Sequence, residues 1–165
     1  MSCGAPDVLI VGAGVVGAAC AYELSRGRLR VSVVEQDVVG GGATAAGMGH
    51  LVALEGAEHE FALSRYSQEM WAELLPQMPP EVEHLKCGTL WVAADEEEKG
   101  EARRKHSYNA AHGVPSEMLD ARQLAKAEPE LRRGLAGGLV APDDSVIYAP
   151  AAAAWLVERS GADVI

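Results

Sequence analysis

The stretch Asp7–Asp37, DVLIVGAGVVGAACAYELSRGRLRVSVVEQD, decides the fold of this chain. It opens with Asp7–Val11, a short apolar run typical of a buried parallel strand, and then places three glycines at G-x-G-x-x-G spacing, Gly12, Gly14 and Gly17. A helix is predicted to begin there and to end at Ser25-Arg26-Gly27, before a second apolar strand over Leu29–Glu35. This order of parts predicts a βαβ unit that binds phosphate at the start of its helix.

Each glycine of the motif has its own mechanical reason. Gly12 permits the tight turn after the strand, Gly14 lets the backbone approach a pyrophosphate, and Gly17 lets the helix lie close to the sheet. Glu35, about 20 residues further on, can accept hydrogen bonds from ribose hydroxyls. In a chain with 18 glycines the spacing alone is weak evidence. The prediction rests on strand, turn, helix, strand and acid occurring in order, which a helix with incidental glycines would not produce.

The next segment, Val38–Gly49, is made of small residues, and five of its twelve are glycine. We predict a loop without strand or helix, in which close backbone approach to a ligand explains the glycines and Thr44 offers a hydroxyl. A flexible linker is the alternative, although a linker would contain more serine and fewer alanine or methionine residues. His50 follows the loop. A lone histidine at such a place is more often a surface residue than a catalytic one.

Alternating helices and strands are predicted for the rest of the chain. A stripe of apolar residues predicts a helix over Glu58–Leu75 that packs through one face, formed by Leu63, Tyr66, Met70 and Leu74. The other predicted elements are a strand over Glu83–Ala94, a helix from its N-cap Asp95 to about His112, a helix over Ser116–Lys126, a strand over Gly137–Ala141, a helix over Ala151–Ser160 closed by Gly161, and a strand over Ala162–Ile165.

Composition excludes several functional classes. The net charge of −10 and the isoelectric point near 4.9 argue against a nucleic-acid partner. A hydrophobic content of 48% and a mean hydropathy of +0.01 are typical of a soluble globular protein. The cysteines, Cys3, Cys20 and Cys87, form no C-x-x-C pair and indicate neither a disulfide framework nor a zinc site, so no metal site is expected. No transmembrane segment or signal peptide is predicted, and we expect a cytoplasmic location.

The predicted strand over Ala162–Ile165 is the third of a parallel sheet, and the sequence stops inside it. A doubly wound sheet needs further strands and helices to cover its faces. We therefore expect a truncated α/β fold, the N-terminal portion of a longer protein.

The sequence resembles the D-amino acid oxidase-like flavoenzymes, which include glycine oxidase, D-amino acid dehydrogenase and D-hydroxyproline dehydrogenase. The resemblance covers the whole chain and is carried by VLIVGAGVVGAACAYEL with Glu35, by GGGATAAGMGH, by CGTLWVAADEEE and by AEPELRRGLAGGL. The D-hydroxyproline dehydrogenases are the most similar of these. The resemblance implies a Rossmann-like FAD-binding domain over residues 1–55 and 148–165, with the first part of an α+β substrate domain inserted over residues 56–147.

The resemblance also implies site residues and a reaction. It implies FAD rather than NAD, and oxidation of the Cα–N bond of a D-amino or imino acid by hydride transfer to the flavin. The residues implied to contact FAD are Gly12, Gly14, Val15, Val16 and Gly17 at the pyrophosphate, Glu35 and Gln36 at the adenosine ribose, and Thr44, Ala45, Gly47 and Met48 along the path to the flavin. His50 would lie near the reactive edge and is a weak candidate for a catalytic role.

Two other functional classes compete with this interpretation. One is a small NAD-binding regulatory module, complete at 165 residues, and the other is a degenerate structural subunit that binds nothing. The intact glycine motif argues against decay, and the unfinished strand argues against completeness. The substrate, the electron acceptor and the oligomeric state, whether homo- or hetero-oligomer, stay open.

Overall fold

The computed structural model describes residues 5–53 and 58–165, and the chain forms two compact units. The first unit contains the described part of Met1–His50 together with Ala72–His84 and Val146–Ile165, and the second contains Leu51–Trp71 and Leu85–Ser145. These units differ from the expected domain boundaries mainly in one segment, Ala72–His84, which belongs to the first unit although it lies within the residues 56–147 expected for the inserted domain.

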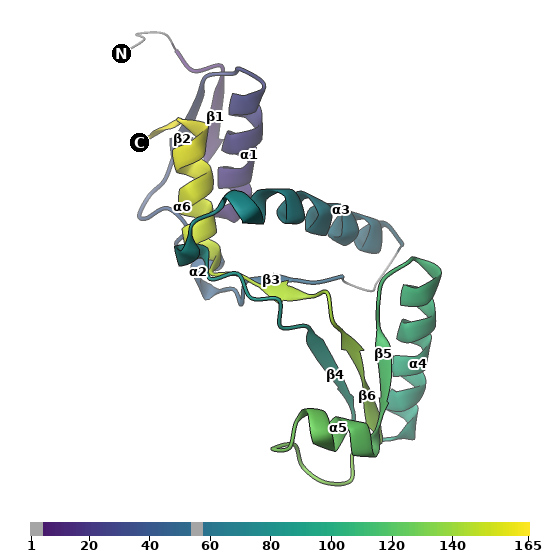
Figure 1. Ribbon diagram of the computed structural model, residues 1–165. Coiled ribbons are helices and arrows are strands. Elements are labelled where there is room, and N and C mark those ends of the chain that lie inside the picture. Colours follow the sequence, from purple (N-terminus) through teal and green to yellow (C-terminus); the bar gives the residue numbers. More distant parts are fainter. Residues whose placement is uncertain (1–4, 54–57) are drawn as a thin grey trace. The chain divides into compact units, whose positions relative to one another are not determined.

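The first unit contains the predicted βαβ motif (Figure 1). Strand β1, Val8–Val11, leads into helix α1, Val15–Arg26, which is followed by strand β2, Val31–Val34. The strands β1 and β2 are parallel, with Val8 opposite Val31 and Val11 opposite Val34. Strand β8, Asp163–Val164, pairs in parallel with the other edge of β2, so the sheet order is β1-β2-β8. The predicted third parallel strand is therefore confirmed.

Helix α6, Ala149–Ser160, packs against α1 in the first unit (Figure 1). The helix surfaces in this interior are built from small residues with no exposed area, namely Ala18, Ala21, Ala152 and Ala153. Alanines at these positions let two helices approach closely and pack at high density. Pro150 lies in the first turn of α6, and Gly161 ends the helix as predicted, in the left-handed conformation with φ of 64°.

An antiparallel sheet forms the centre of the second unit. Its order is β4-β6-β5, with β4 at Thr89–Ala93, β5 at Glu117–Asp120 and β6 at Gly137–Ala141. Helix α4, Glu96–Ala111, and helix α5, Ala121–Ala127, pack against this sheet. The predicted N-cap of α4 is confirmed, because Asp95 Oδ1 accepts a hydrogen bond of 2.9 Å from Glu98 N.

The other elements are shorter or lie where the chain passes between the units. Helix α3 covers Glu58–Leu74, and α2 is a single helical turn at Ala43–Ala46. Strands β3, His50–Leu51, and β7, Ser145–Val146, each contain a point where the chain leaves one unit for the other. Two 3-10 turns follow α3, at Leu75–Gln77 and Pro80–Val82. In the part of the chain that the structure describes, no helix has the length and apolar character needed to cross a bilayer.

The prediction of a helix over Ser116–Lys126 is wrong in its first half. Glu117–Asp120 is strand β5, which pairs with β6 so that Glu117 lies opposite Val140 and Asp120 opposite Gly137. The helix begins only after Asp120, whose side chain accepts hydrogen bonds of 2.8 Å from Arg122 N and from Gln123 N. The Gln123 side chain in turn accepts from Asp120 N at 2.9 Å, which completes a capping box. The residues before the cap, Glu117–Leu119, lie outside the helix and pair with strand β6.

The packing face predicted for α3 is wrong for two of its four residues, whereas Met70 and Leu74 are half-buried. Leu63 and Tyr66 are 69% and 62% exposed, whereas Phe61 is buried. Phe61 packs edge-on against Tyr108 of α4 in the second unit, with ring centroids 5.1 Å apart. The apolar stripe was read correctly as helical, but the residue that anchors the helix lies outside it.

Two smaller predictions need correction. The strand predicted over Glu83–Ala94 is limited to Thr89–Ala93, because Gly88, directly before it, is left-handed with φ of 71°, as is Glu83 with φ of 49°. The loop predicted over Val38–Gly49 contains the helical turn α2, which occupies its longest stretch without glycine, Ala43–Ala46. Alanine has the highest helix propensity, and this favours the turn.

Replacing Asp120 with alanine is expected to lower the free energy of unfolding by about 1 kcal/mol, because the first N–H groups of α5 lose their acceptor. Urea unfolding measured by circular dichroism would give the change. Asp120→Asn keeps an oxygen at the same position and should lose much less. Equal losses in both variants would contradict the capping role.

Candidate functional site

The glycine turn joins the two parallel strands through the backbone. Gly12 has φ of 98°, a conformation that side chains rarely permit, and its N–H donates to Val34 O at the end of β2 over 2.7 Å. A Cβ atom on Gly17 would lie 2.0 Å from Gly12 O. Only a hydrogen atom fits there, so the close approach of α1 to the turn, which the motif predicts, is present.

The N-terminus of α1 faces the hydroxyl of Thr44. Gly14 is the N-cap, and the N–H of Val15 donates to Thr44 Oγ1 over 3.0 Å. A Cβ on Gly14 would lie 3.0 Å from the same oxygen. The first N–H groups of any helix lack acceptors within the helix and form the positive end of its dipole. Thr44 thus marks the place where an anionic group would meet this helix.

The carboxylate of Glu35 is held against the turn. Its Oε2 accepts a hydrogen bond of 2.7 Å from Ala13 N, and its Oε1 accepts one of 3.1 Å from Asp37 N. The hydrogen bond from the Ala13 N–H, followed by that from Asp37, lowers the pKa of Glu35 below its ordinary value. Glu35 is therefore an ionised, acceptor-only group at neutral pH, as recognition of ribose hydroxyls requires.

The small-residue loop packs closely on the rest of the first unit. Gly40 N donates to Ala13 O over 2.9 Å, and a Cβ on Gly40 would lie 2.8 Å from the Cα of Pro150. A Cβ on Gly49 would lie 1.9 Å from Ile147 O. These two glycines are explained by packing within the chain, which a flexible linker would not show.

The structure thus brings together Gly12, Gly14, Gly17, Val15, Thr44 and Glu35. The other predicted residues lie at the surface: Val16 and Met48 are 75% and 78% exposed, and Gln36, Ala45, Gly47 and His50 are also exposed. In the described part of the chain no hydrogen bond joins their side chains to this group. Sequence reasoning missed Ala13, whose N–H fixes Glu35, and Gly40, because a backbone contact leaves no signature in residue type.

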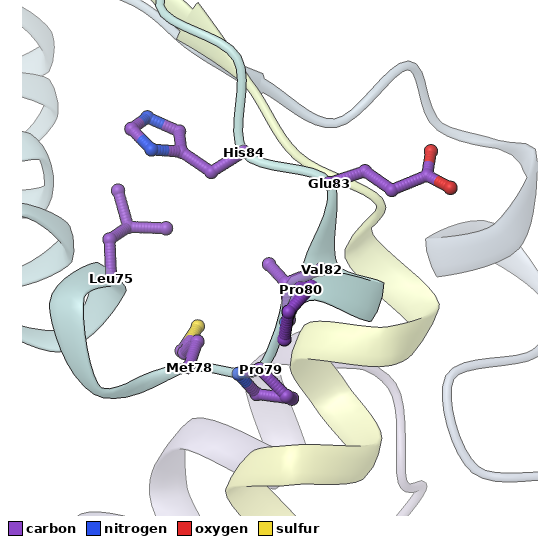
Figure 2. Close-up of a pocket in the computed structure, with 7 residues that line it drawn as sticks. All are labelled: Leu75, Met78, Pro79, Pro80, Val82, Glu83 and His84. Atoms are coloured by element: carbon purple, nitrogen blue, oxygen red, sulfur yellow. The ribbon is translucent and has the colours of Figure 1, made fainter.

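A separate cavity of about 330 Å³ lies in the first unit, lined by Leu75, Met78, Pro79, Pro80, Val82, Glu83 and His84. Figure 2 shows apolar side chains around it and the Glu83 carboxylate pointing away from the other six. None of the predicted cofactor residues lines this cavity, and we do not assign it to the cofactor.

Possible metal ligands and cysteines are scattered over the described residues. Within residues 5–53 and 58–165, no three His, Cys, Asp or Glu side chains are grouped so that they could hold a metal ion. Cys20 and Cys87 are free and exposed, and Cys3 lies outside the described residues.

Comparison with known proteins decides which cofactor this turn serves. The profile of the DAO family, described as FAD dependent oxidoreductase, matches residues 7–165. The chain belongs to this family. The expected resemblance to the D-amino acid oxidase-like family and the expectation of FAD rather than NAD are thereby confirmed. The residues present fit the adenosine diphosphate part of FAD, because a left-handed glycine turn, a helix N-terminus and an ionised carboxylate lie together.

Individual relatives agree with this assignment. Glycine oxidase from Geobacillus kaustophilus is 32% identical over 171 residues, an alignment that covers 94% of this chain and 44% of that protein. Its crystal structure superposes with a TM-score of 0.87, over 97% of this chain and 46% of that one. The crystal structure of iminodiacetate oxidase from a Chelativorans species superposes with a TM-score of 0.75 at 28% identity, over 95% of this chain and 46% of that one. This chain therefore spans less than half the length of these relatives.

The fold extends to enzymes with a different substrate. L-alpha-glycerophosphate oxidase from Mycoplasma pneumoniae, solved with FAD bound, superposes with a TM-score of 0.86 at 24% identity, over 97% of this chain and 44% of that one. At this identity the likeness shows the fold alone. The substrate therefore cannot be read from the fold.

Proposed function

We propose that this chain carries the FAD-binding part of an oxidoreductase that oxidises the Cα–N bond of a D-amino or imino acid of the glycine, sarcosine or D-hydroxyproline type. The observation that carries the proposal is the 32% identity to glycine oxidase over nearly the whole chain. Bound FAD would supply the acceptor for the hydride that leaves Cα. The role of this chain is to bind and orient that cofactor.

The contacts in the first unit support a role for each residue of the group. Gly12, Gly14 and Gly17 would leave room for the pyrophosphate at the start of α1, and Glu35 would accept from the ribose hydroxyls. Thr44 Oγ1 accepts from Val15 N, so its own O–H is the group that can donate to a phosphate oxygen.

The remaining predicted residues are proposed to extend the site. Val15, of the same group, and the neighbouring Val16 would lie beside the pyrophosphate and Gln36 beside the ribose, and Ala45, Gly47 and Met48 would continue from Thr44 towards the flavin. Val15 is half-buried, and the exposure of the other five leaves them accessible to a ligand. His50 would lie near the reactive edge, as a candidate only. Residues 1–55 and 148–165 are proposed for FAD, residues 56–147 for the substrate, and the cytoplasm for the location.

The substrate class can be tested by flavin reduction. The intact protein that contains this chain would be purified with FAD and mixed anaerobically with glycine, sarcosine, D-hydroxyproline and glycerol 3-phosphate, because the chain by itself, which spans less than half of its relatives, is expected to be inactive. Bleaching of the visible flavin absorbance would then be followed. We expect reduction by at least one of the amines and none by glycerol 3-phosphate. Reduction by glycerol 3-phosphate alone would overturn the proposed substrate class.

Glu35→Ala is expected to weaken FAD binding about tenfold or more, because a charge-assisted acceptor for the ribose is lost. The affinity would be measured by the quenching of flavin fluorescence on binding. Glu23→Ala is the matched control, since Glu23 is an exposed residue of α1 that pairs with Arg26. Wild-type affinity in Glu35→Ala would exclude the ribose role.

A further inference from the structure

Asp144 is a buried acidic residue to which the FAD site gives no role. Its exposed fraction is 5%, although the sequence places it in a polar turn, Pro142–Ser145. Acidic side chains are seldom this deeply buried unless their oxygens are paired. The partners of its hydrogen bonds therefore indicate the role of this side chain.

Hydrogen bonds to Asp144 come from three residues in the two segments of the second unit. Its Oδ1 accepts from Ala53 N over 3.2 Å and from Gln68 Nε2 over 3.4 Å, the second a long and weaker bond. Its backbone oxygen accepts from Gly88 N over 2.9 Å. The same Gln68 Nε2 lies 3.4 Å from Leu51 O, so the Gln68 amide contacts both Asp144 and the backbone of Leu51.

Arg65 fixes the orientation of the Gln68 amide. Its Nη1 donates to Gln68 Oε1 over 3.1 Å. An amide whose oxygen is occupied by a guanidinium must present its NH₂ group in the other direction. That NH₂ group is the one directed at Asp144 and Leu51.

These partners lie beside every point at which the chain passes between the two units. Ala53 is the third residue of the segment Leu51–Trp71, and Gln68 is the fourth from its end. Gly88 is the fourth residue of Leu85–Ser145, and Asp144 is the last but one. All four residues belong to the second unit. The side chain and the backbone oxygen of Asp144 therefore link residues near both ends of Leu51–Trp71 with residues near both ends of Leu85–Ser145.

We propose that Asp144 is a positioning residue that ties together the four connections of the second unit and so fixes Leu51–Ala53, the residues that directly follow His50. The expected effect of Asp144 on turnover rests on the proposed function, in which FAD binds to the first unit and the substrate to the second. A displacement of about 1 Å between reacting groups can cost roughly 100-fold in rate, so holding these connections affects the reaction without touching it.

The first test measures amide hydrogen exchange of the intact protein and needs no substrate. In Asp144→Ala the Ala53 amide should exchange roughly tenfold faster, since one hydrogen bond is lost. The Gly88 amide, bonded to the backbone oxygen, should stay as in the wild type. Asp144→Asn keeps Oδ1, and Asp143→Ala removes a neighbouring acid that pairs with Lys86. Both should leave the Ala53 amide unchanged.

Each other outcome of the exchange experiment overturns the proposal. An unchanged Ala53 amide in Asp144→Ala would show that the bond ties nothing. Faster exchange at both Ala53 and Gly88 would show that the whole turn unfolds, which is a structural role. If the Ala53 amide exchanges as fast in Asp144→Asn as in Asp144→Ala, the acceptor oxygen is not what protects this amide.

The second test measures turnover with the best amine substrate. In Asp144→Ala the rate of flavin reduction at saturating substrate should fall about tenfold or more, with unchanged FAD affinity, and Asp144→Asn should restore most of it. An unchanged rate, or an equal loss of FAD binding, would overturn the positioning role. If the wild type reduces its flavin with no amine, the proposed substrate class fails, and the exchange experiment still decides whether Asp144 ties the connections.

Discussion

Gly17→Ala is expected to prevent stable folding of the first unit and, with it, FAD binding. The added Cβ would lie 2.0 Å from Gly12 O, 3.1 Å from Gly12 C and 3.3 Å from Ile10 Cγ2. The oxygen cannot easily move away, because Gly12 N is bonded to Val34 O and anchors the turn to β2. Overpacking against backbone costs about 3 kcal/mol or more, a large part of the stability of a small domain.

Urea unfolding with and without FAD would measure this loss. Gly100→Ala is the matched control: Gly100 lies within α4, and a Cβ there meets nothing within 4 Å. This control should be unchanged or more stable by up to about 1 kcal/mol, because alanine favours a helix over glycine. A Gly17→Ala protein as stable as the wild type would refute the backbone contact.

Gly14→Val is expected to abolish FAD binding while the protein stays folded. Gly14 has φ of −65° and ψ of 174°, a conformation that any residue adopts, so the backbone is not strained by a side chain. A Cβ here would lie 3.0 Å from Thr44 Oγ1, which accepts from Val15 N at the start of α1, and the two methyl groups of valine would add further bulk to this space. That space is where the phosphates are proposed to bind.

Two measurements separate binding from folding in this variant. Equilibrium dialysis would follow retention of FAD, and circular dichroism would follow the helices. Gly14→Ala adds only the Cβ and should bind FAD with intermediate affinity. If the valine variant retains FAD at wild-type affinity, Gly14 is needed only by the fold, and the pyrophosphate must lie elsewhere.

The elements that sequence predicted well are those whose signals are local. Helix α1, strand β6 and helix α6 begin and end within about two residues of prediction, because glycine, proline and apolar periodicity act over a few positions. Glu117–Asp120 was missed because its conformation depends on pairing with β6, about twenty residues away. Leu63 and Tyr66 were misassigned because periodicity identifies a helix but not which of its faces finds a partner.

By itself the sequence determined the βαβ unit, its glycine turn and the carboxylate at Glu35. Each of these features depends on glycine or an acidic residue at a fixed spacing, and that spacing can be read directly from the chain. Only the tertiary structure decided that Ala13 N–H holds Glu35 in place, that Gly40 and Gly49 serve packing, and that Asp144 is buried. The bond from Ala53 to Asp144 spans 91 positions. Each of these contacts has a backbone group as one partner, and every residue carries such groups, so the residue types alone could not show which groups meet.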